Sequence, residues 1–464
     1  MHKGFIVTAV VIAILVVVVF VVVLPYRSAQ TLIPTVQTTP ASIALQKLIT
    51  VLAPCNIMGD GSLIESNDGK LYDINTGLVR LDTHSGFFVV TSPNLAYAVS
   101  GDGNVYDLKT GAVLFTFKPG NTGFAGFTQF SPDSTILVAA GTGVYEMPSG
   151  KQIMPLTSAQ AEIGFSPDSK SLAITADGVY DLPSGQRRFA IGGRTPPYTQ
   201  NQRFSDDGKY LTVDLSGVYE VTTGRRMVVT GGGFFTPDDN FIVSRDGIFR
   251  IDTGTAILTY YTTAQPRLSD DGKRMFVFPV NTNDLTTVGW LVYDVASGQK
   301  LLERPATGKS RSGPIMSNDG RLLAIDGDGI YDVNTGIKRL SLPTGVAVTF
   351  SADGSLIAME GDGIYEAQTG KRISQIPTLH NEGYYAEVGY AKDFASTVFS
   401  LNKQLIADDR ALYEVSTGAK LADGNVHFLK DGLLAIQTTN KDGKNECTTF
   451  NVVPASSATS ASTP

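Results

Sequence analysis

The stretch SPDSTILVAAGTGVYEMPSG, residues 131–150, decides the fold because four further copies of it follow in the chain. In all five copies a Ser lies 14 residues before a Tyr, and that Tyr lies five residues before a Gly. The other copies occupy residues 166–185, 205–224, 317–336 and 351–370. A spacing this regular indicates that the body of the chain is built from repeats.

Looser copies of the same pattern extend the repeat over most of the 464 residues. They surround Tyr72, Tyr106, Phe249, Tyr293 and Tyr413, and a decayed copy surrounds Phe450. The units recur about every 37 residues, a period within reach of propeller and solenoid repeats. We count ten clear units and one remnant.

Each unit predicts four short strands. In the unit at 163–191 the first strand is 163–165, and Ser-Pro-Asp-Ser then forms a turn. An apolar strand at 172–175, a hairpin at Ala-Asp-Gly and a strand at 179–182 follow, and a more polar fourth strand covers 187–191. Outside the N-terminal apolar run no segment has helical periodicity, so we expect an all-β body.

This pattern resembles the blades of WD40-like β-propellers, in which an SPDG-type turn precedes two strands and a Tyr-Asp or Trp-Asp pair precedes Thr-Gly. The resemblance covers residues 43–453 and implies a β-propeller of about ten to eleven four-stranded blades. The Gly-His pair of true WD40 blades is missing. Propellers host many unrelated activities, so the resemblance predicts a fold and no particular function.

The two ends of the repeat region are expected to meet. Rings of four to eight blades are usual, so these units predict one large ring or two propellers. Residues 43–52 read as a fourth strand with no blade before it, whereas the last unit stops after its third strand. We expect the first strand to complete the last blade, which removes two exposed sheet edges.

Cys55 and Cys447 are the only cysteines, and they lie near the two segments that would meet. We expect them to form a disulfide, which would persist only in an oxidising compartment. Two unrelated buried thiols are the alternative.

The N-terminus predicts membrane attachment. Residues 4–24 carry no charge and are long enough to cross a bilayer as a helix, so we interpret 1–24 as an uncleaved signal-anchor. The few flanking charges weakly favour a body outside the cytoplasm. Residues 25–42 resemble a Pro/Thr-rich stalk, and 454–464 form a Ser/Ala/Thr tail that we expect to be disordered.

Composition excludes several classes of site. The formal net charge is -7 and no basic run occurs, which argues against nucleic-acid binding. Four His and two Cys cannot supply a multi-His or CxxC metal site. Asp326, Asp328 and Asp332 superficially resemble a calcium loop but do not match its spacing, so we predict no metal and no cofactor.

No catalytic constellation emerges either. The Tyr-Asp and Tyr-Glu pairs recur in nearly every unit, which favours a structural role for them. A quinoprotein-like dehydrogenase would need a Trp after each Thr-Gly, yet the only Trp is Trp290, which precedes the motif of its unit. A G-x-S-x-G elbow is also missing, so we name no catalytic residue.

Two insertions interrupt the repeat and are the best candidates for a binding surface. Residues 379–394 form one insertion, and residues 279–288, just before Trp290, form the other. Tyr and Trp are enriched at binding hot spots, so we predict a partner-binding surface. Its candidate residues are His380, Glu382, Tyr384, Tyr385, Tyr390 and Trp290. Alternatively, these aromatic residues simply cover a face of the propeller.

The sequence therefore favours a membrane-tethered, extracytoplasmic propeller that binds protein partners without catalysing a reaction. The alternatives are an enzyme or ligand sensor with a site in the central channel, and a structural or adhesive surface protein.

Overall fold

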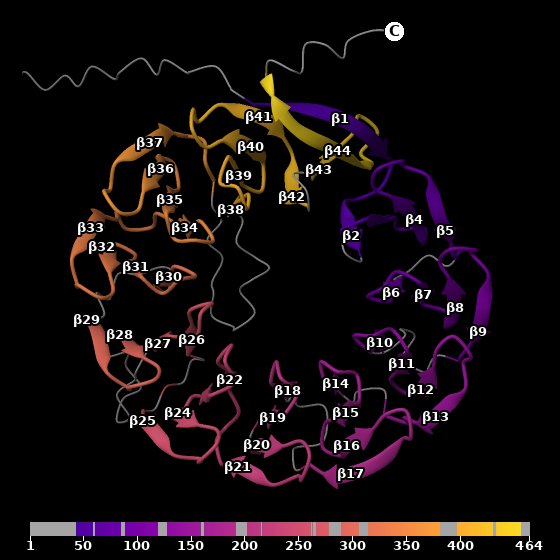
Figure 1. Cartoon of the computed structure of the whole chain (residues 1–464). Coiled ribbons are helices and arrows are strands. Elements are labelled where there is room, and N and C mark those ends of the chain that lie inside the picture. Colours follow the sequence, from indigo (N-terminus) through magenta and orange to yellow (C-terminus); the bar gives the residue numbers. More distant parts are fainter. Residues whose placement is uncertain are drawn as a thin grey trace, which may run out of the picture. The chain divides into compact units, whose positions relative to one another are not determined.

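A computed structural model describes residues 43–58, 61–84, 89–118, 128–158, 162–191, 202–214, 216–260, 262, 266–277, 289–305, 314–380, 397–429 and 433–455. All of them belong to one compact unit, Pro40–Pro464. Within these ranges the chain forms eleven antiparallel sheets of four strands, which are the blades of a single propeller. The all-β prediction is confirmed, and of the two arrangements that the sequence left open the structure shows the single large ring, with eleven blades (Figure 1).

The blades are numbered here in chain order, and their strands are given from first to fourth. Blades 1 to 4 consist of β2 (Asn56–Met58), β3 (Leu63–Glu65), β4 (Lys70–Asp73) and β5 (Val79–Asp82); β6 (Val90–Thr91), β7 (Tyr97–Val99), β8 (Asn104–Asp107) and β9 (Val113–Thr116); β10 (Thr128–Phe130), β11 (Ile136–Ala139), β12 (Gly143–Glu146) and β13 (Gln152–Pro155); and β14 (Ile163–Phe165), β15 (Ser171–Ile174), β16 (Gly178–Asp181) and β17 (Gln186–Ala190). Blades 5 to 8 consist of β18 (Gln202–Phe204), β19 (Tyr210–Val213), β20 (Gly217–Glu220) and β21 (Arg226–Val228); β22 (Phe234–Phe235), β23 (Phe241–Val243), β24 (Gly247–Arg250) and β25 (Ala256–Thr259); β26 (Arg267–Leu268), β27 (Arg274–Val277), β28 (Gly289–Asp294) and β29 (Lys300–Pro305); and β30 (Ile315–Met316), β31 (Leu322–Ile325), β32 (Gly329–Asp332) and β33 (Lys338–Ser341). Blades 9 to 11 consist of β34 (Val348–Phe350), β35 (Leu356–Met359), β36 (Gly363–Glu366) and β37 (Arg372–Gln375); β38 (Val398–Phe399), β39 (Leu405–Ala407), β40 (Ala411–Glu414) and β41 (Lys420–Asp423); and β42 (Asn425–Phe428), β43 (Leu433–Thr439), β44 (Asn445–Pro454) and β1 (Ile43–Val51).

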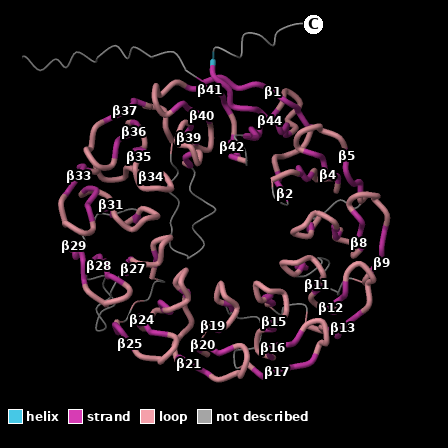
Figure 2. The backbone as a smooth tube through the Cα atoms, in the orientation of Figure 1, coloured by secondary structure: helices cyan, strands magenta, loops and turns pink. Residues whose placement is uncertain are grey.

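The strands follow one another outward from the centre of the ring. The first strand of each blade lies next to the central opening and the fourth lies on the outside (Figure 1). Turns and loops link the strands around the whole ring (Figure 2). In blade 4 the four predicted strands are confirmed, with β15, β16 and β17 each beginning one residue earlier than expected.

The hydrophobic core lies between neighbouring sheets. The second strand of blade 4 is buried along its whole length. Its Leu172 and Ile174 pack against Ile136, Val138 and Val144 of blade 3. Because both faces of such a strand meet another sheet, its sequence is continuously apolar rather than alternating.

The first strand closes the ring. β1 pairs with β44 in antiparallel register from Ile43↔Pro454 to Val51↔Cys447, so it is the fourth strand of blade 11. The predicted completion of the last blade by an N-terminal strand is therefore confirmed. Blade 1 contacts blade 11 at this point. Cys55, which precedes blade 1, packs with Ala435 of blade 11 and donates its backbone N–H to Gln437 Oε1 at 2.9 Å.

Every fourth strand carries a β-bulge at the same place. In blade 1 the bulge leaves Arg80 unpaired between Leu71↔Leu81 and Tyr72↔Val79. In blade 11 it leaves Leu48 unpaired between Thr449↔Ile49 and Phe450↔Lys47. The same register shift occurs in each of the other nine described blades. Bulges on edge strands hinder pairing with the edges of other sheets.

The predicted signal-anchor at 1–24 and stalk at 25–42 lie outside the described residues, as does most of the predicted tail. Across the ranges that the structure describes, we find no helix with the length and apolar character needed to cross a membrane.

Candidate functional site

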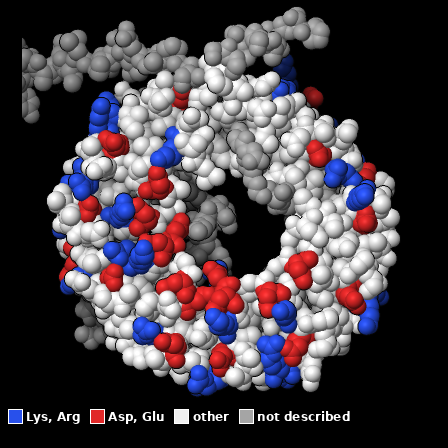
Figure 3. Space-filling model, viewed as in Figure 1, with Lys and Arg blue, Asp and Glu red and all other residues white. Residues whose placement is uncertain are grey.

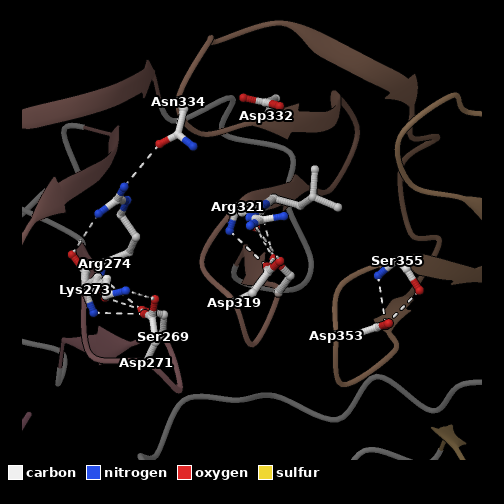
Figure 4. Close-up of polar contacts among 12 residues, drawn as sticks. Ser269, Asp271, Lys273, Arg274, Asp319, Arg321, Asp332, Asn334, Asp353 and Ser355 are labelled. Atoms are coloured by element: carbon white, nitrogen blue, oxygen red, sulfur yellow. Dashed lines mark hydrogen bonds and ion pairs between the residues drawn. The ribbon is translucent and has the colours of Figure 1, made fainter. Parts of the chain in front are cut away.

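The turns between first and second strands, here called the inner turns, are held by a Ser and an Asp two residues later. In blade 4, Ser166 Oγ donates to Asp168 Oδ1 at 2.7 Å and accepts the N–H of Ser171 at 2.9 Å. Asp168 also accepts the N–H of Lys170. Figure 4 shows equivalent turns at Ser269–Asp271, Asp319 and Asp353. The Ser-x-Asp motif is therefore a hydrogen-bonded turn, repeated blade after blade.

The fourth residue of the inner turns has a left-handed conformation, and where it has a side chain it contacts the preceding blade. It has positive φ in nine described turns, at Leu95, Ser134, Ser169, Gly208, Asp239, Gly272, Gly320, Gly354 and Lys403. Where this residue has a side chain, it reaches the preceding blade: Ser169 Oγ accepts the N–H of Asp133 at 3.0 Å, and Lys403 Nζ donates to Asp353 Oδ2 at 2.6 Å. A non-glycine residue with positive φ is costly, and here its side chain makes a contact between blades.

The outer turns, which join third to fourth strands, explain the Tyr-Asp and Tyr-Glu pairs. Asp107 Oδ1 accepts the N–H groups of Lys109 and Thr110 and the hydroxyl of Thr110. Glu366 accepts the hydroxyl of Thr369. The acidic residue thus caps the turn that ends in Thr-Gly, which supports the structural role predicted for these pairs.

The carboxylates that resemble a calcium loop have separate partners. Buried Asp326 accepts the N–H of Gly345 at 2.6 Å. Asp328 accepts the hydroxyl of Tyr331 and forms an ion pair with Lys338, whereas Asp332 caps its outer turn and pairs with Arg339. In the described ranges no three His, Cys, Asp or Glu side chains are grouped as metal ligands.

The inner turns give one arc of the ring a strongly acidic rim. Among the inner turns that the structure describes in full, those of blades 3 to 9 have an aspartate at the second, third or fourth position, whereas those of blades 2 and 10 have none. This acidic arc consists of Asp133, Asp168, Asp206, Asp207, Asp238, Asp239, Asp270, Asp271, Asp319 and Asp353. Figure 3 shows acidic side chains gathered beside the central opening.

The environment shifts the pKa values of these aspartates in opposite directions. The hydrogen bond from Ser166 lowers the pKa of Asp168, and that from Lys403 lowers the pKa of Asp353 strongly. Burial raises the pKa of Asp239, and the nearby charges of Asp207 and Asp206 add to this. Most turn carboxylates are thus stabilised as anions, whereas Asp239 sits in a crowded, partly desolvated position.

The insertion between blades 9 and 10 begins at a cluster of charged residues. Asp408 Oδ2 accepts the N–H of His380 at 2.9 Å, and the His380 Nδ1 and Asp409 Oδ1 atoms are 3.2 Å apart. Arg410 Nη2 lies 3.2 Å from His380 Nε2. On the other side of the insertion, Thr397 Oγ1 donates to His380 O at 3.0 Å. The two ends of the insertion are therefore bonded directly to each other.

Of the six predicted binding residues, the structure describes two. His380 lies in the cluster just described, and Trp290 is 8% exposed. The Trp290 ring packs against Phe276 in the core between blades 7 and 8. Glu382, Tyr384, Tyr385 and Tyr390 lie outside the described residues, as does the insertion at 279–288.

The sequence interpretation missed two features. It overlooked the partners of His380, although Ala-Asp-Asp-Arg at 407–410 departs from the Gly-Asp-Gly hairpins of other units. It also overlooked the fourth inner-turn position, where Ser, Asp, Leu or Lys replaces the Gly of sister copies. In both cases a deviation from the repeat marked the contact.

The cysteines meet as predicted. Cys55 and Cys447 lie at disulfide distance, with Cα atoms 5.0 Å apart, and both are buried in the core between blades 11 and 1. The pair joins the first residues of the propeller to its last strand.

Comparisons with known proteins add little to this description. No family model matches the chain, and no curated protein matches it. Among solved structures, it is similar to a crystal structure of the eukaryotic initiation factor, with 14% identity over 83% of this chain and 89% of that chain, and a TM-score of 0.40. The assignment to the β-propeller fold rests on the eleven sheets of the chain itself.

Proposed function

We propose that this chain is a membrane-tethered β-propeller outside the cytoplasm that binds protein partners and catalyses no reaction. The insertion at 379–394 would carry the partner site, with Tyr384, Tyr385 and Tyr390 as its aromatic contacts. The enzyme or sensor function and the adhesive function remain alternative predictions.

The supporting observation is the way in which this insertion is attached. The polar residues of the repeat are occupied in turns, as at Asp107 and Ser166. The insertion instead lies close to His380 on one side and Thr397 on the other, and these two residues are hydrogen-bonded to each other. A loop whose ends are held together on a rigid scaffold is a common form of binding site.

Partner recovery tests the binding site. The full-length protein, solubilised from its own membrane, is used to capture partners before and after changing Tyr384, Tyr385 and Tyr390 to Ser. We expect recovery of the partner to fall by ~tenfold or more, because aromatic hot spots dominate binding energy. The control is Leu401→Ser, which changes an exposed apolar residue in the inner turn of blade 10.

The two variants separate binding from stability. Both should melt at the temperature of the wild type, because exposed substitutions move stability little. Unchanged recovery by the triple variant, or equal loss with Leu401→Ser, would place the partner site elsewhere.

Protease protection tests the location. Protease added to intact cells or spheroplasts should digest the body while leaving cytoplasmic proteins whole. Full protection of residues 43–453 would refute an extracytoplasmic body, and a mature N-terminus near residue 30 would refute the retained anchor.

A further inference from the structure

A cavity of about 280 Å³ lies where blade 3 is linked to blade 4. Its lining includes residues 156–158, which follow β13, and residues 175–177, which form the hairpin between β15 and β16. Met154 and Tyr180 line it as well. We call this cavity the blade 3–4 cavity. It is separate from the inner and outer turns and from the insertion between blades 9 and 10.

Hydrogen bonds within the chain hold the lining of the blade 3–4 cavity in place. Gly141 donates its backbone N–H to Ser158 O at 3.1 Å, which fixes the link after β13 to the hairpin of blade 3. Thr175 donates its backbone N–H to Glu162 O at 3.0 Å. The cavity is therefore formed without a ligand, as most small-molecule sites are.

One buried hydroxyl group of the lining has no partner. Thr175 is 7% exposed, and within the described part of the chain its Oγ1 atom makes no hydrogen bond. The large majority of buried side-chain polar atoms do have a partner. An unpaired buried hydroxyl costs free energy, and a ligand that bonds to it recovers that cost.

The residue after Thr175 has a strained backbone. Ala176 has a φ of 56°, whereas blades 3, 8 and 9 have Gly141, Gly327 and Gly361 at the same hairpin position. A side chain in the left-handed region is unfavourable, and such residues cluster at ligand sites. The lining of the blade 3–4 cavity thus departs from the repeat at two adjacent residues.

Asp177 adds a carboxylate whose charge is already balanced. Its Oδ2 atom accepts the hydroxyl of Tyr180 at 2.7 Å, and Arg187 Nη1 lies 3.6 Å from Oδ1. Each carboxylate oxygen can accept more than one hydrogen bond. Because Arg187 balances the charge of Asp177, the cavity favours an uncharged hydrogen-bond donor over a cation.

We propose that the blade 3–4 cavity binds a neutral ligand rich in hydroxyl groups, of the size of a single sugar ring. Ligand hydroxyls both donate and accept hydrogen bonds, which suits a lining that combines a carboxylate with the hydroxyls of Thr157, Ser158 and Thr175. Met154 and Tyr180 offer apolar surface to the C–H groups of the ring. The volume lies just below the about 300–1,000 Å³ of sites for drug-sized ligands, which favours a small one.

Saturation-transfer NMR tests this site in the full-length protein, in a detergent without a sugar headgroup. The probes are the methyl glycosides of glucose, galactose, mannose and N-acetylglucosamine, and at least one should bind. Thr175→Val keeps the shape of the side chain but removes its hydroxyl, so it should weaken binding of that probe by ~tenfold. Its melting temperature should not fall, because no hydrogen bond within the chain is lost.

Two control variants match the changes in the cavity. Thr212→Val removes another buried hydroxyl that is unpartnered among the described residues, but Thr212 does not line the cavity, so binding should be unchanged. Asp177→Asn should weaken binding because it removes the carboxylate. Asp362→Asn should not, although Asp362 contacts Tyr365 and Arg372 of blade 9 in the same way.

Three outcomes would overturn the proposal. The first is a lack of saturation transfer to all four glycosides. The second is equal binding by the wild type, Thr175→Val and Asp177→Asn, which would place the sugar elsewhere on the chain. The third is a crystal soaked with the bound probe that shows only an ordered water at Thr175, which would make the cavity a structural water site.

Discussion

Asp239 Oδ2 accepts the backbone N–H of Asp207 at 2.8 Å, although 32 residues separate them and they belong to neighbouring blades. Asp239 Oδ1 accepts the N–H of Asp206 as well. The side chain can do this because Asp239 has a φ of 54°, which turns it toward blade 5. The free-energy cost of the strained backbone at Asp239 is thus offset by two hydrogen bonds between blades.

Asp239→Ala should therefore destabilise the propeller by ~1–3 kcal/mol, because two N–H groups lose their acceptor while the positive φ remains. Asp239→Asn keeps an acceptor and tolerates positive φ, so it should lie closer to the wild type. Thermal melting of both variants measures the difference. Equal stability of the Ala and Asn variants would contradict a role for the hydrogen bonds.

Ser166→Ala should cost ~1–3 kcal/mol, because the N–H of Ser171 is buried and would lose its acceptor. Ser166→Thr is the matched control, since Thr236 makes the same bonds to Asp238 and Phe241 in blade 6. Chemical denaturation compares the two. If Thr destabilises as much as Ala, the hydroxyl is not what holds the turn.

Gly418→Ala should be more harmful than Gly111→Ala. Both residues end outer turns, with φ values of 74° and 71°, so both substitutions place a Cβ in a left-handed conformation that costs ~1–2 kcal/mol. At Gly418 the new Cβ would also lie 2.4 Å from the carbonyl oxygen of Gln375 in blade 9, whereas at Gly111 nothing lies within 4 Å. Melting temperatures of the two variants should therefore differ, and identical losses would show that the outer turns do not press on the preceding blade.

Acid should destabilise the propeller. Each carboxylate whose pKa the fold lowers, such as Asp168 beside Ser166 and Asp353 beside Lys403, adds stability above the ordinary value of 3.8 that is lost as pH falls through the lowered value. The raised pKa of the partly buried Asp239 acts in the opposite sense, since its contribution is lost as pH rises. Because lowered values are the majority, the melting temperature should fall from pH ~5 to pH ~2.

Lys403→Met supplies the control for this pH profile. It removes the main cause of the low pKa of Asp353, so it should lower the melting temperature near neutral pH more than at pH ~2. A profile that is flat from pH ~5 to pH ~2 in the wild type would contradict the assignment.

The cysteine pair should resist reductant until the ring opens, because both residues are buried. Non-reducing peptide mapping should link the Cys55 and Cys447 peptides in the wild type. Changing both to Ser should lower stability, and the loop-entropy account allows up to ~5 kcal/mol for so long a loop. Two thiols that react with alkylating reagent in native, unreduced protein would contradict this pairing.

The repeat made the blades predictable, because each strand and turn is specified by residues only a few positions apart. Ser166, Asp168 and Gly185 belong to one unit, so a local pattern sufficed. The closure of the ring was also predictable, because the strand at 43–52 has no blade of its own and the last unit lacks a fourth strand. The number of rings was not, because the angle between successive blades depends on contacts such as Leu172 with Ile136, which no single unit encodes.

The candidate site was less predictable for a related reason. His380 could be singled out by its insertion, but Asp408, Asp409 and Arg410 lie about thirty residues further on in another hairpin. Trp290 shows the converse. Its position after an insertion suggested a surface, whereas the strand β28 places the ring between two sheets.

β1 has the same register as the other ten fourth strands. The geometry of the ring therefore does not depend on which blade contains the two ends of the repeat region. Ile43 and Pro454 are paired on the adjacent strands β1 and β44, so a short peptide bridge between them would give a cyclic polypeptide. Such a chain could be reopened at another outer turn, for instance between Thr223 and Gly224, and each blade would keep its four strands. Circular permutants of this kind would differ from the parent chiefly in where the Cys55–Cys447 link falls, inside the sequence rather than near its two ends.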